Sequence, residues 1–161
     1  MRKPVRIWWA RPRKLCALER PGGGGRSHRP DRRAAEIEYL ISCGVRLVVS
    51  TMTTRHGLSA YEEAGIEWHH VPVASFTGAD AERAFEELLV FLRRETRKRG
   101  AIAVHGNRHT DFVAALCAAH VHEVKQVDPE EALAEAAAAG LMVTPEVAAL
   151  VGVEWAEPLP A

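Results

Sequence analysis

Three short apolar segments, each leading into a polar loop and then a helical pattern, constrain the fold of this chain most strongly. They are "VRLVVS" at 45–50, "IEWHHVPV" at 66–73 and "AIAVH" at 101–105. Continuous apolar runs of this length are typical of strands buried within a parallel sheet. The sequence therefore predicts an α/β fold, a single-domain three-layer sandwich whose mostly parallel central sheet is flanked by helices.

Helical periodicity and capping signals place helices around these strands. They are expected at about 31–41, 59–64, 80–99, 110–120, 128–139 and 144–151. Asp31, Ser59 and Asp128 are the expected N-cap residues, Ser59 with Glu62 as a capping box. Gly100 is expected to stop the long third helix. Five arginine and lysine residues at 93–99 then complement the negative end of that helix, which favours a helix terminus over a nucleic-acid surface.

The remaining segments complete one domain over residues 1–161, with a core of about 5–152 and a tail at 153–161. "VRIWWA" and "KLCAL" predict an opening hairpin. "ERPGGGGRSHRPD" at 19–31 is expected to be a mobile linker. In a weaker alternative, Arg26, His28 and Arg29 of this segment fold over an anion.

The charge balance and the cysteines narrow the class of protein. The chain has 21 basic and 21 acidic residues, so its net charge gives no reason to expect nucleic acid or a membrane as partner. No apolar run approaches the length of a membrane span. Cys16, Cys43 and Cys117 lie in apolar settings without disulfide or metal spacing, which favours buried thiols in a reducing cytoplasm.

Polar residues gather where the strand at 101–105 ends and the next helix begins. Ligands of open α/β sheets bind at the carboxyl ends of strands, and helix N-termini attract anions. The candidate ligand- or anion-binding residues in this and two neighbouring strand-end loops are His105, Gly106, Asn107, Arg108, His109, Thr110, Arg55, His56 and Ser75. The loop after the strand at 101–105 and the loop after the strand at 45–50 are expected to form two walls of one cleft.

His109, Arg108 and Asp111 are the candidates for acid–base and anion-stabilising chemistry, with Asn107 and Asp111 orienting the imidazole. The alternative is that Thr110 or Asp111 caps the helix and its neighbours are solvated. Five histidines lie near strand ends, but His69 and His70 point to opposite faces of a strand, so no metal site is predicted. No cofactor is predicted either.

Several words of the sequence, in this order, resemble the cysteine-dependent tyrosine and dual-specificity phosphatases. "WWARPRKLCALERPGGG" is similar to W-x-x-P-x-x-L-x-x-x-x-x-P, "LISCGVRLVVSTM" to L-x-x-x-G-V-x-x-V-V-S-L, and "YEEAGIEWHHVPV" to E-x-x-G-I-x-x-x-x-x-P-I. "AIAVH" and "TDFVAALCAAH" bracket the place of V-H-C-x-x-G-x-x-R-T-G, and "DPEEALAEAAAAG" resembles the helix that follows. The resemblance covers residues 7–140 and implies the phosphatase fold.

The same resemblance implies altered chemistry. His105 is followed by Gly106 where the family has its cysteine nucleophile, and the loop is three residues short. His109 stands in the place of the phosphate-binding arginine, with Arg108 beside it, and Ser75 in the place of the general-acid aspartate. We therefore expect a pseudophosphatase without cysteine phosphatase activity that binds an anionic or small ligand, such as a phosphorylated molecule, or a protein partner.

Two alternatives remain open from the sequence. The first is an enzyme with a repurposed cleft that uses the His109, Arg108 and Asp111 set. The second is a residual phosphatase with another nucleophile, for which Cys117 is a poor candidate because helical spacing places it inside an apolar helix.

Overall fold

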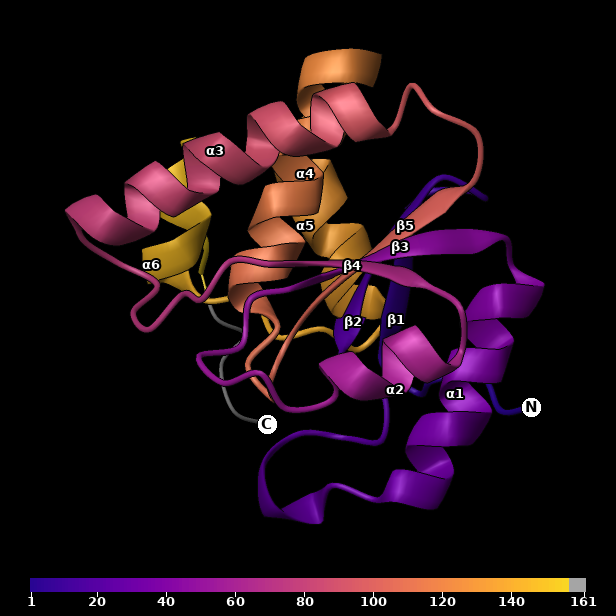
Figure 1. Cartoon of the computed structure of the whole chain (residues 1–161). Coiled ribbons are helices and arrows are strands. Elements are labelled where there is room, and N and C mark those ends of the chain that lie inside the picture. The colour runs from indigo at the N-terminus through magenta and orange to yellow at the C-terminus, as the bar shows by residue number, and fades with distance from the viewer. Residues whose placement is uncertain (157–161) are drawn as a thin grey trace.

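A five-stranded mixed sheet forms the centre of the molecule (Figure 1). The computed structural model describes residues 1–156, so the part of the predicted tail at 157–161 lies outside the described residues. The strands are β1 (Ile7–Arg11), β2 (Leu15–Glu19), β3 (Val45–Ser50), β4 (Glu67–His70) and β5 (Ala101–Gly106), in the order β1-β2-β5-β3-β4. The hairpin β1–β2 is antiparallel and the other three pairings are parallel, which confirms the predicted fold class.

Helices cover both faces of the sheet. One face carries α3 (Ala79–Glu95), α4 (Asp111–Lys125), α5 (Pro129–Ala138) and α6 (Pro145–Ala148), and the other carries α1 (Pro30–Ser42) and α2 (Leu58–Glu63) (Figure 1). Two 3-10 turns, Gly25–Ser27 and Ala149–Val151, complete the described elements. No helix within residues 1–156 is both long and apolar enough to cross a membrane.

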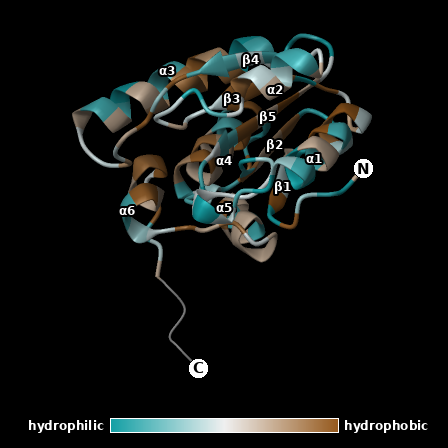
Figure 2. Cartoon of the chain, turned by 60° about the horizontal axis from the view of Figure 1, so that its bottom comes forward, coloured by the Kyte–Doolittle hydropathy of each residue, from teal (hydrophilic) through white to brown (hydrophobic). Residues whose placement is uncertain are grey.

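Alternation along the strands divides the core between the two faces. On β5, Ile102 and Val104 pack toward α3 and α4, whereas Ala101 and Ala103 pack toward α1 and α2. Figure 2 shows hydrophobic residues gathered on the central strands, while hydrophilic and hydrophobic residues alternate along α3. Helix α4 is buried along most of its length, including Cys117, so the end of β5 and the start of α4 have a rigid support.

Several predicted helix boundaries were wrong for physical reasons. Arg29, not Asp31, is the N-cap of α1, and Gly57, not Ser59, is the N-cap of α2, so no capping box forms. Helix α3 ends at Glu95, before Gly100, because the Arg46 guanidinium takes up the Glu95 and Arg99 carbonyl oxygens.

Three further segments, on the C-terminal side, can be compared with the prediction. Helix α4 continues to Lys125, beyond the predicted end at His120, and stops where Gln126 adopts a left-handed conformation. Asp128 caps α5 as predicted, since its carboxylate accepts a hydrogen bond from the Glu130 amide at 3.1 Å. Trp155 of the predicted tail packs partly buried against the core.

Candidate functional site

Residues 106–110, called the short loop below, join β5 to α4. Because β5 pairs in parallel with β2 and β3, its carboxyl end opens at the middle of the sheet. Gly106 ends the strand and Thr110 precedes the helix, so only Asn107, Arg108 and His109 are exposed between them. A loop of this length presents more side-chain groups than backbone groups to a ligand.

Residues 20–28, called the glycine loop below, pack against the short loop. The Gly25 amide donates to Asn107 Oδ1 at 2.8 Å, and the Arg20 amide donates to the Asn107 carbonyl oxygen at 3.4 Å. Gly24 lies so close to the short loop that a Cβ added there would be 2.4 Å from Arg108 Cβ. The prediction of a mobile linker was therefore wrong, because hydrogen bonds and a close backbone approach fix this segment.

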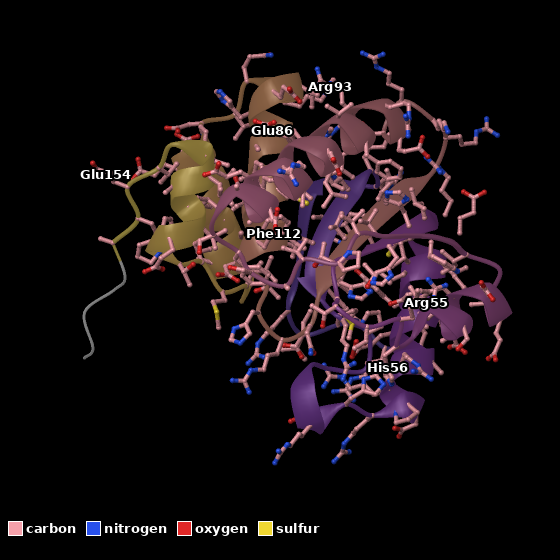
Figure 3. All side chains as sticks on the ribbon, turned by 60° about the vertical axis from the view of Figure 1, so that its left-hand side comes forward. Arg55, His56, Glu86, Arg93, Phe112 and Glu154 are labelled. Atoms are coloured by element: carbon pink, nitrogen blue, oxygen red, sulfur yellow. The ribbon has the colours of Figure 1, made fainter. Side chains whose placement is uncertain are left out.

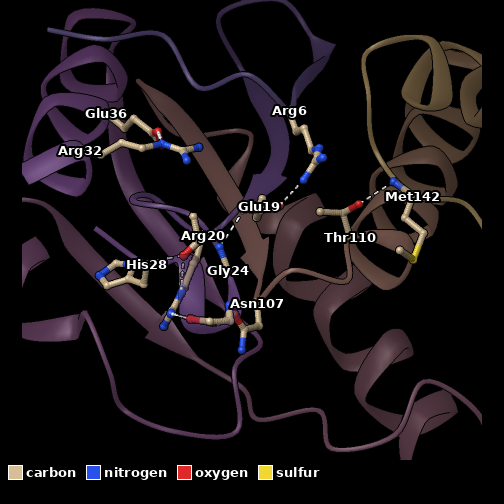
Figure 4. A network of polar contacts seen from close by, with 12 residues as sticks. Arg6, Glu19, Arg20, Gly24, His28, Arg32, Glu36, Asn107, Thr110 and Met142 are labelled. Atoms are coloured by element: carbon tan, nitrogen blue, oxygen red, sulfur yellow. Dashed lines mark hydrogen bonds and ion pairs between the residues drawn. The ribbon is translucent and has the colours of Figure 1, made fainter. Parts of the chain in front are cut away.

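Arg20 holds the glycine loop by its carbonyl groups (Figure 4). Its guanidinium donates to the Gly23 carbonyl oxygen at 2.8 Å and to the Gly25 carbonyl oxygen at 3.0 Å. A third contact, of 3.0 Å, joins it to Nδ1 of His56. The buried guanidinium thus connects the glycine loop to the loop that follows β3.

Two carboxylates hold the glycine loop by its amide groups. Glu19 accepts from the Gly24 amide at 2.7 Å and forms an ion pair with Arg6 at 3.0 Å (Figure 4). Glu36 accepts from the Gly22 amide at 3.2 Å and pairs with Arg32. The chain's own side chains therefore occupy backbone donors of the kind that cradle phosphate in glycine-rich loops.

A cleft of about 1130 Å³ lies between the two loops, the start of the chain and the α5–α6 connection. Its lining residues are Pro4, Val5, Arg6, Glu19, Gly23, Gly24, Gly25, Arg26, Ser27, Arg32, Glu36, Asn107, Arg108, His109, Thr110, Gly140, Leu141 and Met142. Arg6 and Arg32 are neutralised by Glu19 and Glu36. Arg26 and Arg108 form no ion pair within residues 1–156, so the cleft has an excess of positive charge.

The structure brings four predicted site residues to this cleft: Asn107, Arg108, His109 and Thr110. Thr110 does not cap α4 with its side chain. Instead its hydroxyl oxygen accepts from the Met142 amide at 2.7 Å, which joins the short loop to the α5–α6 connection. Thr110 therefore occupies the N-cap position named in the alternative prediction, but its hydroxyl fixes one wall of the cleft and does not cap the helix.

His105 and Gly106 lie behind the cleft and do not line it. His105 is buried, donates from Nδ1 to the Gly106 carbonyl oxygen at 2.8 Å, and accepts at Nε2 from the Tyr61 hydroxyl at 2.8 Å. Burial lowers the pKa of His105 to about 4, so this imidazole is neutral at physiological pH. Its two hydrogen bonds hold the end of β5 from the face of the sheet that α2 covers.

Asp111 does not assemble with His109 as predicted. Its Oδ2 accepts from the Thr144 hydroxyl at 2.8 Å, and its buried Oδ1 has no hydrogen-bond partner among the described residues. Asn107 likewise accepts from the glycine loop at its side-chain oxygen. The prediction that these two residues orient His109 was therefore wrong, because each already binds a different segment.

Arg55, His56 and Ser75 do not form a second wall of the cleft. The Arg55 guanidinium lies 5.0 Å from the centre of the Trp68 ring, and His56 contacts Arg20. Ser75 donates to the Thr77 carbonyl oxygen at 3.1 Å, within its own loop. Figure 3 shows Arg55 and His56 on the flank opposite Glu154, and none of the three residues lines the cleft.

The space beside Gly106 is tight even for a single Cβ atom. A Cβ added there would lie 3.0 Å from the His109 carbonyl oxygen and 3.3 Å from Thr51 Oγ1. Cys16 and Cys117 are buried, which raises the pKa of each thiol and disfavours a thiolate. Within residues 1–156, no group of three potential metal-ligating side chains converges.

Sequence reasoning missed the residues that the cleft takes from distant segments. Arg6 and Glu19 come from the opening hairpin, and Leu141 and Met142 from the α5–α6 connection. The only available signal was the basic glycine-rich segment, which contains Arg26. The contribution of the others depends on how β1 packs against β2 and α5.

No family model matches the sequence, and no curated protein matches it. Solved structures do. Tk-PTP in its active form gives a TM-score of 0.68 at 17% identity, over 91% of this chain and 93% of that one. Human DUSP28 gives 0.68 at 20% identity, over 93% and 94%. PTPMT1, solved in complex with PI(5)P, gives 0.65 at 16% identity, over 91% and 92%.

The chain has the tyrosine and dual-specificity phosphatase fold. Tk-PTP and DUSP28 are covered almost end to end, so the similarity extends over the whole domain. Identities of this size establish the fold alone. The chemistry of this phosphatase-fold protein therefore has to be derived from its own short loop and cleft.

Proposed function

We propose that this protein is a pseudophosphatase that binds an anionic ligand in the cleft without transferring a phosphoryl group to a cysteine. The observation that carries the proposal is the pair of guanidiniums, Arg26 and Arg108, which line one cleft beside His109 and have no carboxylate partner within residues 1–156. Exposed guanidiniums suit phosphate because their planar donors match two oxygens at once.

The absence of a competent nucleophile supports binding over turnover. The strand ends in Gly106, and a carbonyl oxygen of His109 faces that position where a phosphoryl group would need donors. The Cys117 thiol is fully buried inside α4. Because Asp111 is buried against Thr144, the alternative of acid–base catalysis by His109 with Asp111 is less well supported.

The proposed ligand is a phosphorylated small molecule or a phosphorylated group on a protein partner. PTPMT1, which shares the fold, was solved with PI(5)P, so an anionic ligand is compatible with this architecture. The proposal includes a reducing, cytoplasmic setting, because Cys16, Cys43 and Cys117 are all free thiols.

Calorimetric titration with phenyl phosphate tests the proposal. We expect saturable binding, weakened about tenfold in Arg108→Gln because one charge-assisted contact is lost. Arg99→Gln, an exposed arginine that does not line the cleft, is the matched control and should bind as the wild type does. Equal weakening in both variants would show non-specific charge attraction and contradict the proposal.

A turnover assay separates binding from catalysis. We expect no hydrolysis of phenyl phosphate by the wild type, and none by Gly106→Cys, since the new thiol would face a carbonyl oxygen and not a cradle of amides. Hydrolysis that persists in Cys117→Ser and disappears in Arg108→Gln would contradict the proposal and establish a catalytic cleft.

A further inference from the structure

Four basic side chains meet at the glycine loop without lining the cleft: Arg20, His28, Arg33 and His56, called the basic cluster below. The two imidazole rings lie 5.0 Å apart between centroids and nearly perpendicular to each other. Arg20 contacts Nδ1 of His56 at 3.0 Å, and Arg33 contacts Nε2 of His28 at 3.5 Å. Three separate segments, the glycine loop, α1 and the loop after β3, supply these groups.

The hydrogen bonds fix which atoms of the cluster remain available. A guanidinium can only donate, so His56 Nδ1 and His28 Nε2 are acceptors and both imidazoles are neutral. His28 uses its Nδ1–H on the Gly23 carbonyl oxygen at 3.1 Å. The Nε2–H of exposed His56 and further N–H groups of Arg33 are then free to donate to a ligand.

No carboxylate forms an ion pair with the cluster within residues 1–156. The nearby carboxylates of Glu19 and Glu36 are held by Arg6 and Arg32 and by amides of the glycine loop. Tyr61, which faces the cluster from α2, is a neutral phenol because burial raises its pKa. The neutral His105 imidazole lies behind it, bonded to that phenol.

Buried positive charge without a counter-ion is unfavourable in a protein. The Arg20 side chain is buried, and its guanidinium contacts only carbonyl oxygens and a neutral imidazole. A small anion beside His56 would supply the missing negative charge. Since His56 is exposed, its ring can rotate away from Arg20 and let both groups donate to the same anion.

We propose that the basic cluster is a second binding site, for a phosphate- or sulfate-type oxyanion held by Arg20, Arg33, His28 and His56. This site is separate from the cleft, so it neither needs nor implies the function proposed above. Burial and the two guanidiniums lower the pKa of His28 and of His56. A bound oxyanion opposes the effect of the guanidiniums, so binding takes up protons and strengthens as the pH falls.

Sulfate titration followed by NMR of the histidine rings tests the proposal, because the charge of sulfate is constant between pH 6 and pH 8. We expect the His28 and His56 ring signals to shift together and saturate, with affinity about tenfold higher at pH 6 than at pH 8. His122, exposed in the last turn of α4, serves as the reference signal and should not move.

Two variants with matched surroundings decide whether the cluster is the site. Arg33→Gln should weaken sulfate binding about tenfold, whereas Arg29→Gln, an exposed arginine of the same segment, should leave it unchanged. His56→Gln should also weaken sulfate binding, and because His56 is exposed this change leaves the buried side chains in place. Equal effects of Arg33→Gln and Arg29→Gln, or shifts that rise linearly without saturation, would mean an adventitious ion only and overturn the proposal.

The same titration keeps the two proposals apart. The His109 ring reports the cleft, so saturable shifts of His109 alone would overturn the second site and leave the cleft standing. Shifts of His28 and His56 alone would support the second site and count against the cleft. A parallel titration with phenyl phosphate identifies the source: tighter binding than sulfate assigns the site to an esterified phosphate, and weaker binding assigns it to a free oxyanion.

Discussion

The glycine loop and the short loop lie against each other at the carboxyl ends of the neighbouring strands β2 and β5, yet different groups hold them in place. The glycine loop is fixed through its backbone, since Arg20 binds its carbonyl groups and Glu19 and Glu36 bind its amides. The short loop is fixed at its ends, by buried His105 on one side and by Thr110 bonded to Met142 on the other.

This difference decides what each loop can offer a ligand. The amides of Gly22, Gly24 and Gly25 already bind oxygen atoms of the protein, so the glycine loop provides a surface and few free donors. The short loop leaves the Arg108 and His109 side chains exposed. Under the proposed function, an anion would therefore contact guanidinium and imidazole groups more than a cradle of backbone N–H groups.

Gly24→Ala should break the contact between the two loops most severely. Gly24 has an ordinary extended conformation, so an alanine there is strained only by its clash with the Arg108 backbone. We expect a loss of about 3 kcal/mol in the free energy of unfolding, measured by urea denaturation.

Gly25→Ala is the matched control for this change. Its φ of +62° imposes backbone strain, but the nearest side-chain atom, Arg108 Cδ, is 3.5 Å from the added Cβ. The expected loss is about 1 kcal/mol. An effect of Gly24→Ala no larger than that of Gly25→Ala would show that the loops are not tightly packed.

Acidification should have the second-largest effect, a loss of stability through His105, the buried residue that precedes the short loop. Burial lowers the pKa of His105 to about 4, whereas in the unfolded chain it titrates near its ordinary value of 6.5. Between these values the unfolded chain binds a proton that the folded chain does not, so the free energy of unfolding falls as the pH falls, by about 1.4 kcal/mol per pH unit from this residue.

Urea denaturation at a series of pH values from 7 to 4 measures this slope. His120, whose pKa burial also lowers to about 4, adds a similar slope and stays in place in the comparison. His105→Gln removes the His105 contribution, so its stability should depend less steeply on pH than that of the wild type. Parallel slopes for the two proteins would contradict the buried, neutral state of His105.

Asn107→Ala should have the smallest effect of the three. It removes the acceptor of the Gly25 amide and should cost about 1 kcal/mol of stability. Asn107→Asp keeps an acceptor in the same place and should stay close to the wild type in urea denaturation. If both variants are equally unstable, the side-chain oxygen is not what joins the two loops.

Much of the fold could be predicted because it depends on local patterns. The apolar runs that became β3 and β5 and the Asp128 cap of α5 are properties of a few adjacent residues. Boundaries failed where a distant side chain intervened, as when Arg46 took up the carbonyl groups at the end of α3. The candidate site could be predicted only in part, namely at Asn107, Arg108, His109 and Thr110.

The sequence by itself determined that this chain forms a mostly parallel sheet sandwiched by helices and that no cysteine follows His105 at the end of β5. Only the tertiary structure decided that the glycine-rich segment is fixed against the short loop, and that Asp111 turns to Thr144 and His56 to Arg20. The physical reason is the distance along the chain over which each effect acts. Periodicity and capping act over a few residues, whereas the partner of a polar side chain depends on which distant segments the folded core brings beside it.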